Sequence, residues 1–529
     1  MPSARASGCK TPSRVKSFPA WEVWSGVGQL VLSPDGKYLG MFQVTEHQAE
    51  VHATSTGKRL YWTGASGTLF AIAFSADGTT LATAGGDDCL VLWDAATGKQ
   101  LRRISGTNRA ESWAASRAEA ISFSADGRTI ALAAGNNVRL WDPHTGKEIR
   151  RLSGHRGPVT SIRFAPDGKE LTTRCGADIC RWETKGWTET GWRPAEGNEK
   201  RSDPVDSSDG RSRAAEVERI DPLPYRTGVV ERDGRSPHIR VWEPATGRKL
   251  EYLTGRPVEE TVGSVSAIAF SPDGRMLALA VAPNSRRYVG DTIEGGASVH
   301  LWELSTGLER RVFPGHREPV CSLAFSPDGR FLISGSEDTT ALVWDVTGRE
   351  RAVRRASMPA KDLPVLWEAL AGADAARAYR AVCALIAVPE QAVPFLQERL
   401  RPAAATQNEH LARLIGELET GSRARRTSAV RELERLGEVA EPMLRNALKE
   451  KPTLELRRRV ELILAKLSGP DQDPEQLRGL RAIECLEHMA VPGARGLLKQ
   501  LGGGAPEARI TLEAKAALRR LESRRDSSQ

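Results

Sequence analysis

The chain has 529 residues, of which 40% are hydrophobic and 27% are charged. This length allows two to four domains, and the composition excludes both a largely disordered chain and one that needs disulfides or metals to hold a core. The formal net charge of +8 is too small to indicate a nucleic-acid-binding protein by itself. It is also uneven, because 31 basic and 24 acidic residues lie from Arg351 onward, against 44 and 43 before it.

The seven cysteines are scattered along the chain and show no spacing typical of zinc ligands. An odd number of isolated cysteines is typical of free, packed thiols in a reducing compartment, so we predict a cytoplasmic protein. No segment approaches the ~20 consecutive apolar residues that a membrane helix needs, and we therefore expect no membrane-spanning part.

Two patterns alternate along the first two-thirds of the chain. The first is a turn ending in Asp-Gly, which indicates a hairpin because glycine accepts the positive φ of a tight turn. It occurs seven times, at residues 33–36, 75–78, 124–127, 165–168, 207–210, 271–274 and 326–329. The second is an apolar strand that ends in a tryptophan and an acidic residue. Its copies are Trp93-Asp94, Trp141-Asp142, Trp182-Glu183, Trp242-Glu243, Trp302-Glu303 and Trp344-Asp345, and His52 takes the tryptophan position in a seventh copy.

Each repeat predicts four short strands separated by turns. In the last repeat, VCSLAFS, FLISGS and ALVWD are β-rich segments, and a further strand follows the Thr-Gly turn. One four-stranded sheet cannot bury both of its faces, whereas seven sheets packed radially can. Closing such a ring needs one strand beyond Trp344. We expect residues 15–18 to supply it from the N-terminus, with residues 350–354 as the alternative.

With these patterns, residues 14–355 resemble the WD-repeat (tryptophan–aspartate) β-propeller family. The resemblance implies a seven-bladed propeller with a buried, hydrogen-bonded tetrad in its blades. The last repeat matches all four tetrad positions, with His316, Ser334, Asp338 and Trp344. Two other repeats match in part, with His155, Thr173 and Trp182 (Gly176 replaces the aspartate) and with Thr83, Asp87 and Trp93 (no Gly-His pair). Because unpaired buried polar groups are costly, the resemblance implies a structural role for these residues rather than a catalytic or metal-binding one.

Two repeats carry insertions between their second and third strands, at residues 218–236 and 283–296. In the family this connection lies on the same face as the Gly-His loop, and a third extension precedes the third repeat. Tyrosine, tryptophan and arginine dominate interface energies, so we predict partner-binding residues there. They are Tyr225, Arg226, Arg286, Arg287, Tyr288 and Trp113. The alternative is neutral drift, because exposed loop tips tolerate insertion.

The fifth repeat is the weakest of the seven. Its expected first strand, KRSDPVD, contains Pro204, which cannot donate a hydrogen bond in the middle of a sheet.

After about residue 356 the apolar residues take a helical period, as in Leu411, Leu414, Ile415 and Leu418. We predict a linker over residues 356–364 and an α-helical domain over residues 365–523. The phrases VPFLQERL, AEPMLRNALK and VPGARGLLKQL recur about 50 residues apart and resemble HEAT-like helical hairpins. The resemblance implies an array of stacked hairpins that share a core.

Basic residues cluster on these predicted helices, around Arg423, Arg457 and Arg519. Acidic residues are interleaved with them, so solvated faces with i,i+4 ion pairs are favoured over a phosphate-binding surface.

No motif for a nucleophile, a P-loop, a dinucleotide site or a metal site is present. We therefore predict no enzyme, no cofactor and no metal, and a scaffold that binds other proteins through the propeller and the helical domain. Nucleic acid and membranes are not expected as partners, and the sequence predicts no oligomeric state. Two alternatives stay open: a nucleic-acid-associated regulator that uses the basic helices, and an enzyme with its active site in the central opening of the propeller.

Overall fold

The computed structural model describes residues 21–526, apart from a number of gaps. These gaps are residues 23–26, 44–47, 55–57, 65–68, 86–88, 106–119, 166–167, 176–177, 195–204, 207–212, 218–237, 243–248, 251–262, 284–286, 290–291, 295–296, 349–357, 360, 403–407, 437–439, 450–451, 468–472, 490 and 507.

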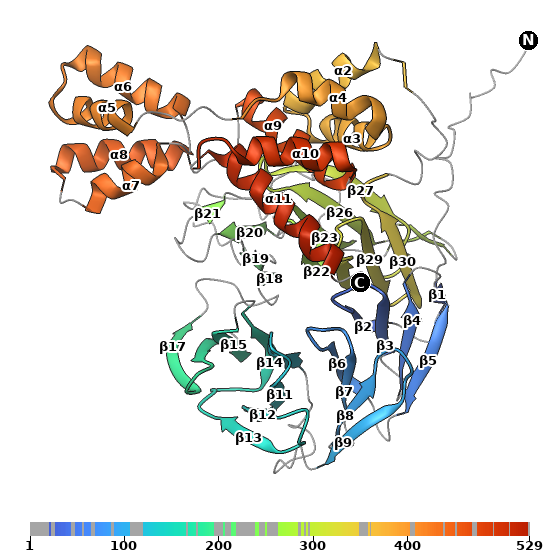
Figure 1. Ribbon diagram of the computed structural model, residues 1–529. Coiled ribbons are helices and arrows are strands. Elements are labelled where there is room, and N and C mark those ends of the chain that lie inside the picture. Colours follow the sequence, from blue (N-terminus) through green and yellow to red (C-terminus); the bar gives the residue numbers. More distant parts are fainter. Residues whose placement is uncertain are drawn as a thin grey trace, which may run out of the picture.

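The first part of the chain forms seven four-stranded antiparallel sheets in its described residues, which we number in chain order (Figure 1). Sheets 1 to 4 consist of β2 (Val27–Leu32), β3 (Tyr38–Gln43), β4 (Gln48–Ala53), β5 (Arg59–Gly64); β6 (Leu69–Phe74), β7 (Thr80–Gly85), β8 (Cys89–Asp94), β9 (Gln100–Ser105); β10 (Ile121–Phe123), β11 (Ile130–Ala134), β12 (Asn137–Trp141), β13 (Glu148–Leu152); and β14 (Val159–Phe164), β15 (Glu170–Cys175), β16 (Asp178–Glu183), β17 (Thr188–Pro194).

Sheets 5 to 7 follow the same plan, with a small hairpin added in sheet 6 and a strand from the chain start added in sheet 7. They consist of β18 (Val205–Asp206), β19 (Arg213–Val217), β20 (His238–Trp242), β21 (Lys249–Leu250); β22 (Gly263–Phe270), β23 (Met276–Pro283), β26 (Ser298–Glu303), β27 (Leu308–Pro314), with the hairpin β24 (Arg287–Val289) and β25 (Thr292–Glu294); and β28 (Val320–Phe325), β29 (Phe331–Ser336), β30 (Thr340–Asp345), β1 (Trp21–Glu22).

The Asp-Gly turns join the first and second strands of the sheets. In the first turn, the Ser33 hydroxyl donates to Asp35 at 2.6 Å and accepts from the backbone N–H of Tyr38 at 2.9 Å. Gly36 has a φ of 71°, which explains why glycine recurs there. The same serine–aspartate bond recurs in the turns of sheets 2, 3, 6 and 7, so one local motif sets the hairpins of these sheets.

The tryptophan of the second sequence pattern pairs with the same position of the second strand in several sheets. Leu332 pairs with Trp344 in sheet 7, and Leu81 pairs with Trp93 in sheet 2. Leu39 pairs with His52 in the same way, so the histidine stands where the other sheets have tryptophan.

The sheets follow one another around a ring (Figure 1). First strands of neighbouring sheets contact each other at β2–β6, β6–β10, β10–β14, β18–β22, β22–β28 and β28–β2. The sheet with β30 receives its fourth strand from the chain start, where Trp21 pairs with Ala341 and Glu22 with Thr340. The expected N-terminal closure therefore occurs, but through residues 21–22 rather than 15–18. Residues 15–18 and 350–354 lie outside the described part.

Sheet 5 begins with a strand of two residues, Val205–Asp206, immediately after Pro204. Pro204 itself lies outside the described residues. The insertions lie where the sequence predicts them, between second and third strands. Residues 218–237 lie outside the described part, whereas the later insertion contains the hairpin β24–β25.

Ten helices follow in the described part of the chain. They are α2 (Asp362–Ala371), α3 (Ala375–Ile386), α4 (Pro389–Arg399), α5 (Asn408–Thr420), α6 (Arg423–Leu436), α7 (Glu441–Lys449), α8 (Leu454–Leu467), α9 (Pro474–Met489), α10 (Pro492–Gly502) and α11 (Arg509–Asp526). Helix α2 begins inside the predicted linker, because Pro364 lies in its first turn, where the missing N–H costs nothing. Helix α11 extends past the predicted end at residue 523.

The helices form two cores rather than one row of stacked hairpins. Helices α2–α4 and α9–α11 share one core, and α5–α8 form another, which projects as a separate lobe (Figure 1). The sequence predicts a single array of stacked hairpins. The structure differs from it because α9 is buried on nearly every side from Ala482 to Glu487. Such a helix needs neighbours all round, and α2, α3, α10 and α11 supply them.

No helix in the described residues is long and apolar enough to cross a membrane.

Candidate protein-interaction surfaces

The tetrad of sheet 7 is joined by hydrogen bonds. His316 contacts Asp338 through Nδ1 at 3.0 Å and the Ser334 hydroxyl through Nε2 at 2.7 Å. The Trp344 indole N–H donates to the same hydroxyl at 2.8 Å. A Cβ on Gly315 would lie 2.9 Å from the Trp344 ring, which explains the glycine before the histidine.

Asp338 is the charged member of this tetrad. Burial would raise its pKa, but hydrogen bonds from His316, Thr340 and the Arg317 backbone hold the pKa of Asp338 well below its usual range. Because Asp338 follows β29 and His316 precedes β28, both connections lie at one edge of the sheet. We call this edge of the ring the Gly-His face, and the opposite edge, with the Asp-Gly turns, the Asp-Gly face.

The eroded tetrads replace the missing members locally. In sheet 2, Trp93 donates to Thr83 at 2.9 Å, and Asp87 lies outside the described residues. In sheet 4, His155 contacts Thr173 at 2.7 Å, and Trp182 donates to the same hydroxyl at 3.0 Å. With Gly176 at the tetrad position of the aspartate, His155 Nδ1 instead contacts the backbone carbonyl of Asn136 at 3.1 Å. Burial lowers the pKa of His155.

We expect sheet 4 to lose stability as the pH falls below about 6.5, the ordinary pKa of histidine. The folded-state pKa of His155 lies below that value, so the unfolded chain binds a proton more readily. The stabilisation is therefore complete above the unfolded pKa and is lost as the pH falls through the folded one. Hydrogen exchange of β14–β16 between pH 7.5 and 5, corrected for intrinsic rates, measures the loss. A His155→Gln variant with the same pH dependence would contradict this explanation.

Sheets 3 and 6 lack the tetrad hydroxyl. Leu132 and Leu279 stand two residues beyond the partner of the tryptophan, where sheets 2, 4 and 7 have threonine or serine. The indole N–H groups of Trp141 and Trp302 are buried and have no hydrogen-bond acceptor among the described residues. The tetrads thus stabilise some sheets more than others.

The predicted partner-binding residues are only partly placed by the structure. Arg287 and Tyr288 lie on β24, in the hairpin between β23 and β26, which is a second-to-third connection and belongs to the Gly-His face. Trp113, Tyr225, Arg226 and Arg286 lie outside the described residues. Whether these insertions form one site stays a prediction.

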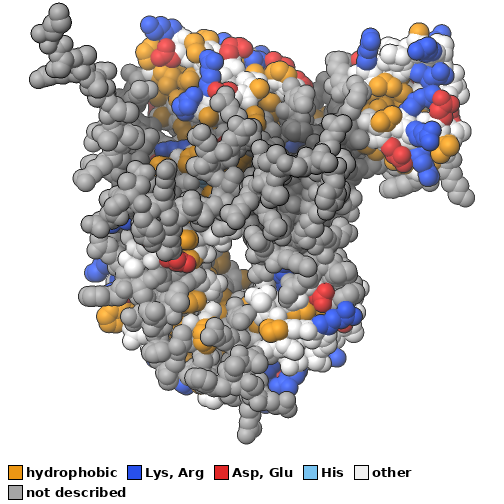
Figure 2. Space-filling model, turned by 180° about the vertical axis from the view of Figure 1, so that it is seen from behind, with side chains coloured by type: hydrophobic (Ala, Val, Ile, Leu, Met, Phe, Trp, Pro, Cys, Tyr) orange, Lys and Arg blue, Asp and Glu red, His pale blue; other side chains and the backbone are white. Residues whose placement is uncertain are grey.

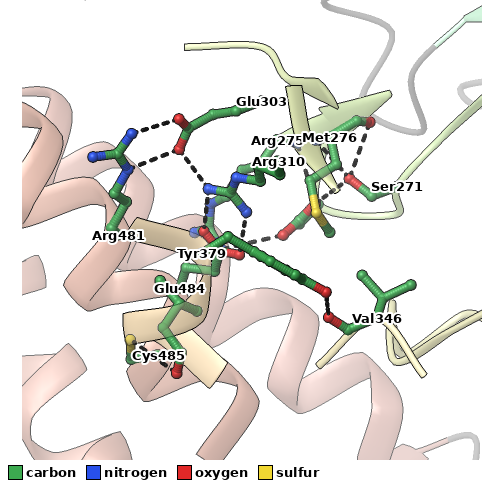
Figure 3. A network of polar contacts seen from close by, with 12 residues as sticks. Ser271, Arg275, Met276, Glu303, Arg310, Val346, Tyr379, Arg481, Glu484 and Cys485 are labelled. Carbon is green, nitrogen blue, oxygen red and sulfur yellow. Dashed lines mark hydrogen bonds and ion pairs between the residues drawn. The ribbon is translucent and has the colours of Figure 1, made fainter. Parts of the chain in front are cut away.

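The helical region docks on the Asp-Gly face of sheets 6 and 7, through a buried ionic network that the sequence analysis missed (Figure 3). Arg310 on β27 donates to Glu303 at 2.5 Å and to Glu484 of α9 at 2.7 Å. Arg481, also on α9, donates to Glu303 at 2.6 Å and 2.9 Å. Arg481 also donates to the Leu370 carbonyl. All four charged side chains are buried.

The network stabilises the ionised form of Glu303. Burial would raise the pKa of Glu303, but the Arg310 and Arg481 guanidinium groups lower it to about 2. A second cluster joins the β22–β23 turn to α9 and α11, where Arg275 contacts Glu487 at 3.0 Å and Glu513 at 3.4 Å. Two ionic clusters therefore join the helical core to the propeller-like part.

Tyr379 of α3 repeats a contact that the sheets make among themselves. We use the word seam for the contact between two neighbouring sheets. At a seam, the fourth (outer) strand of one sheet meets the turn that follows the third strand of the next sheet. At the seam between sheets 1 and 2, the Tyr61 hydroxyl on β5 donates to the Ala95 carbonyl at 2.7 Å, one residue after Asp94. At the seam between sheets 6 and 7, the Tyr379 hydroxyl donates to the Val346 carbonyl, one residue after Asp345. Helix α3 thus bridges the last seam of the ring.

Replacing Tyr379 by phenylalanine should lower the free energy of unfolding by about 1–2 kcal/mol, because it leaves a buried carbonyl without its donor. Hydrogen exchange at β30 and thermal unfolding of the full chain measure the effect. Tyr61→Phe is the matched control, and it should cost less because Tyr61 is only half-buried. Unchanged exchange at β30 in the Tyr379→Phe variant would show that this hydroxyl does not hold the seam.

The lobe α5–α8 presents exposed side chains of two kinds. Leu454 and Leu462 are exposed on α8, and Arg457 and Arg458 lie between them. Figure 2 shows basic side chains along this lobe. One predicted i,i+4 pair forms, between Glu455 and Arg459. In the described part of the lobe, Arg457 and Arg458 make no ion pair, so they are available to a ligand.

No cluster of His, Cys, Asp and Glu side chains suited to a metal ion occurs among the described residues.

Comparison with known proteins identifies the repeat. A family model described as "WD domain, G-beta repeat" matches residues 58–94, 146–180 and 307–345, so the chain carries WD repeats. Each match begins before the outer strand of one sheet and extends into the third strand of the next. A WD repeat therefore spans a seam between two sheets.

Several curated proteins are similar to part of the chain. Nuclear distribution protein PAC1 of Arthroderma otae is 35% identical over 109 residues, which is 21% of this chain and 22% of the relative. The guanine nucleotide-binding protein subunit beta of Arabidopsis thaliana is 33% identical over 129 residues, 24% of this chain and 31% of the relative. Target of rapamycin complex subunit LST8 of Saccharomyces cerevisiae is 31% identical over 110 residues, 20% of this chain and 30% of the relative. The chain thus spans less than a third of the length of each of these relatives.

Proposed function

We propose that this chain is a non-enzymatic protein–protein interaction scaffold built on a seven-bladed WD-repeat propeller. The names of two relatives, a guanine nucleotide-binding protein subunit and a subunit of the target of rapamycin complex, describe components of assemblies and support this interpretation. The docking surfaces we propose are the Gly-His face, with Arg287 and Tyr288, and the lobe α5–α8, whose two helix pairs are HEAT-like hairpins. The cytoplasmic location stays a prediction.

The observation that carries the proposal is the buried network around Arg310. It attaches the helical core to the Asp-Gly face of sheets 6 and 7. The helical core therefore does not lie on the Gly-His face, and the two proposed docking surfaces are on different parts of the molecule. Two partners bound there would be held on one chain, which raises their effective concentration toward each other.

Separate variants of the two surfaces test the proposal in the full chain. Arg287→Ala with Tyr288→Ala changes the Gly-His face, and Leu462→Asp with Arg458→Glu changes the lobe. Affinity purification from the source organism should lose different proteins with each pair. Loss of the same proteins from both variants, or from neither, would contradict two docking surfaces.

The same experiment addresses the nucleic-acid alternative, which the exposed arginines of α6 and α8 favour. Nucleic acid bound at Arg458 should dissociate steeply as salt is raised, because each phosphate contact releases counterions. Recovery of nuclease-sensitive material with wild type but not with the lobe variant would support that alternative over a protein partner.

A further inference from the structure

Helix α8 of the lobe carries two leucines on the side that faces away from the core of the lobe. Leu454 and Leu462 are 70% and 65% exposed, the largest exposed fractions of any large hydrophobic side chain in the described residues. Leu456, Val460 and Ile463 of the same helix are buried in the core of the lobe. Since residues four apart on a helix lie on one side of it, Leu454 and Leu462 form an apolar stripe that this chain leaves uncovered.

The stripe is flanked by unpaired positive charge. Arg458 lies one turn from each of the two leucines, and Arg457 is its exposed neighbour. Neither makes an ion pair among the described residues, whereas Glu455 pairs with Arg459. Glu461 is also exposed and makes no ion pair in the described part. On the outward side of α8, two unpaired arginines thus stand against one unpaired glutamate.

Helix α6 packs beside α8 and adds to this positive charge. Arg423, Arg425 and Arg431 are exposed on α6 and make no ion pair among the described residues. Glu432 is the acid of α6 whose side chain is described, and it is only partly exposed. Packed helices lie about 8–10 Å apart, and charges act over about 8–10 Å in physiological salt, so the arginines of α6 are felt at α8. A ligand of α8 therefore meets a positive potential, in line with the basic side chains on the lobe in Figure 2.

The mixture of side chains fits a protein segment better than a nucleic acid. Helices α6 and α8 contain no aromatic residue on which a base would stack. A phosphate backbone would leave Leu454 and Leu462 without an apolar contact, and the Glu461 carboxylate would repel it. A segment with both apolar and acidic side chains covers the leucines and neutralises the arginines together.

The helical form of α8 determines the form of its partner. The backbone N–H and C=O groups in the middle of a helix are bonded within it, so α8 offers no edge to an extended strand. A second helix satisfies its own backbone groups and packs its side chains between those of α8. Leu454 and Leu462 are eight residues apart, about 12 Å along the helix axis. A helix that covers both leucines therefore needs apolar residues seven or eight positions apart.

We propose that α8 binds an acidic amphipathic helix of a partner protein. Apolar side chains of that helix cover Leu454 and Leu462, and carboxylates between them face Arg457 and Arg458. This inference rests on the proposed function, because it names the partner of the lobe, one of the two docking surfaces proposed there. A nucleic acid, a second copy of the chain and an extended peptide are outcomes that the test separates.

Site-specific photo-crosslinking in the full chain tests this proposal. A benzophenone amino acid replaces Leu462 and, as a control, Val365, which is 57% exposed on α2, outside the lobe. After expression in the source organism, the adduct is digested and the linked peptide is sequenced. We expect an acidic segment with apolar residues seven or eight apart, linked at position 462 and not at 365. A basic segment, one without this spacing, a peptide of this chain, a nucleic-acid adduct or no adduct would overturn the proposal.

Binding of the sequenced segment, made as a synthetic peptide, gives the second measurement. Leu454→Ala with Leu462→Ala should weaken binding by at least about tenfold, as at interface residues that carry most of the binding energy. Arg457→Glu with Arg458→Glu should weaken it and reduce its salt dependence. Arg413→Glu, which changes an exposed arginine of α5, is the matched control and should weaken it much less. The circular dichroism of the peptide should become helical on binding, and undiminished binding in both α8 variants, or a peptide that stays extended, would overturn the proposal.

Failure of this site can be told apart from failure of the scaffold function. If the peptide does not bind α8 but affinity purification still recovers proteins that depend on Arg287 and Tyr288, this inference is wrong and the scaffold function stands. If neither the lobe nor the Gly-His face recovers a protein, both are wrong.

Discussion

Replacing Arg310 by leucine is expected to destabilise the junction of the ring and the helical core by about 3–5 kcal/mol, the cost of leaving a buried charge without its partner. Glu303 keeps Arg481, but Glu484 loses the guanidinium that contacts both of its oxygens. Because Glu484 is 3% exposed, water cannot take over these contacts. The measurement is urea unfolding of the full chain, with limited proteolysis to detect separation of the helices from sheets 6 and 7.

A double variant and an exposed pair serve as controls. Arg310→Leu with Glu484→Leu removes both charges, so it should be more stable than Arg310→Leu alone, because no unpaired charge is left in the junction. Arg399→Ala removes an ion pair with the exposed Glu398 and should change stability by less than about 1 kcal/mol. If Arg310→Leu were no worse than Arg399→Ala, the network would not hold the two parts together.

The repeats could be predicted from the sequence because they encode local structure. A serine, an aspartate and a glycine within four residues close the same hairpin wherever they occur, and the paired leucine and tryptophan fix the register two strands later. The tetrad of sheet 7 could be located for the same reason, since its histidine, serine and tryptophan each have a fixed place in the repeat. Closure from the N-terminus followed from the phase, and the described pairing lies at Trp21 and Glu22, whereas residues 15–18 lie outside the described part.

The docking of the helices could not be predicted in this way, because it depends on contacts between residues about 170 positions apart. A repeat pattern describes the residues that all the sheets share. The junction between sheet 6 and the helical core instead depends on residues that sheet 6 does not share with the other sheets. Arg310 stands where sheets 1 to 3 have leucine or isoleucine, and this exception was a usable signal. So was the spacing of Arg481, Glu484 and Glu487, which puts three charges on one side of a helix.

The helical array was mispredicted for a related reason. Its hairpin phrases recur about every 50 residues, and a single row of stacked pairs is the simplest arrangement for such a pattern. The buried length of α9 instead requires a second layer, which brings the end of the chain back to α2–α4. Among the described residues, helices α5–α8 share a core of their own. The lobe α5–α8 is separate because the chain that follows it, α9–α11, packs back on α2–α4.

Ser334→Ala is expected to cost about 2–4 kcal/mol, because it leaves two buried donors or acceptors unpaired at once. The hydroxyl of Ser334 is the common partner of His316 and Trp344, and it is fully buried. Unfolding of the full chain by denaturant measures the loss, and hydrogen exchange at β28–β30 shows whether it is confined to sheet 7.

The contribution of the tetrad hydrogen bond is isolated by comparing two tryptophans that are equally buried, Trp93 and Trp141, each 6% exposed. Trp93 donates to Thr83, whereas Trp141 has no acceptor among the described residues. Both lose the same ring atoms on replacement by phenylalanine, so the loss of packing is similar. Trp93→Phe should therefore be more destabilising than Trp141→Phe by about 1–2 kcal/mol, because only Trp93 gives up a satisfied hydrogen bond and leaves a buried hydroxyl behind. Equal losses would mean that the tetrad stabilises its sheet through packing alone.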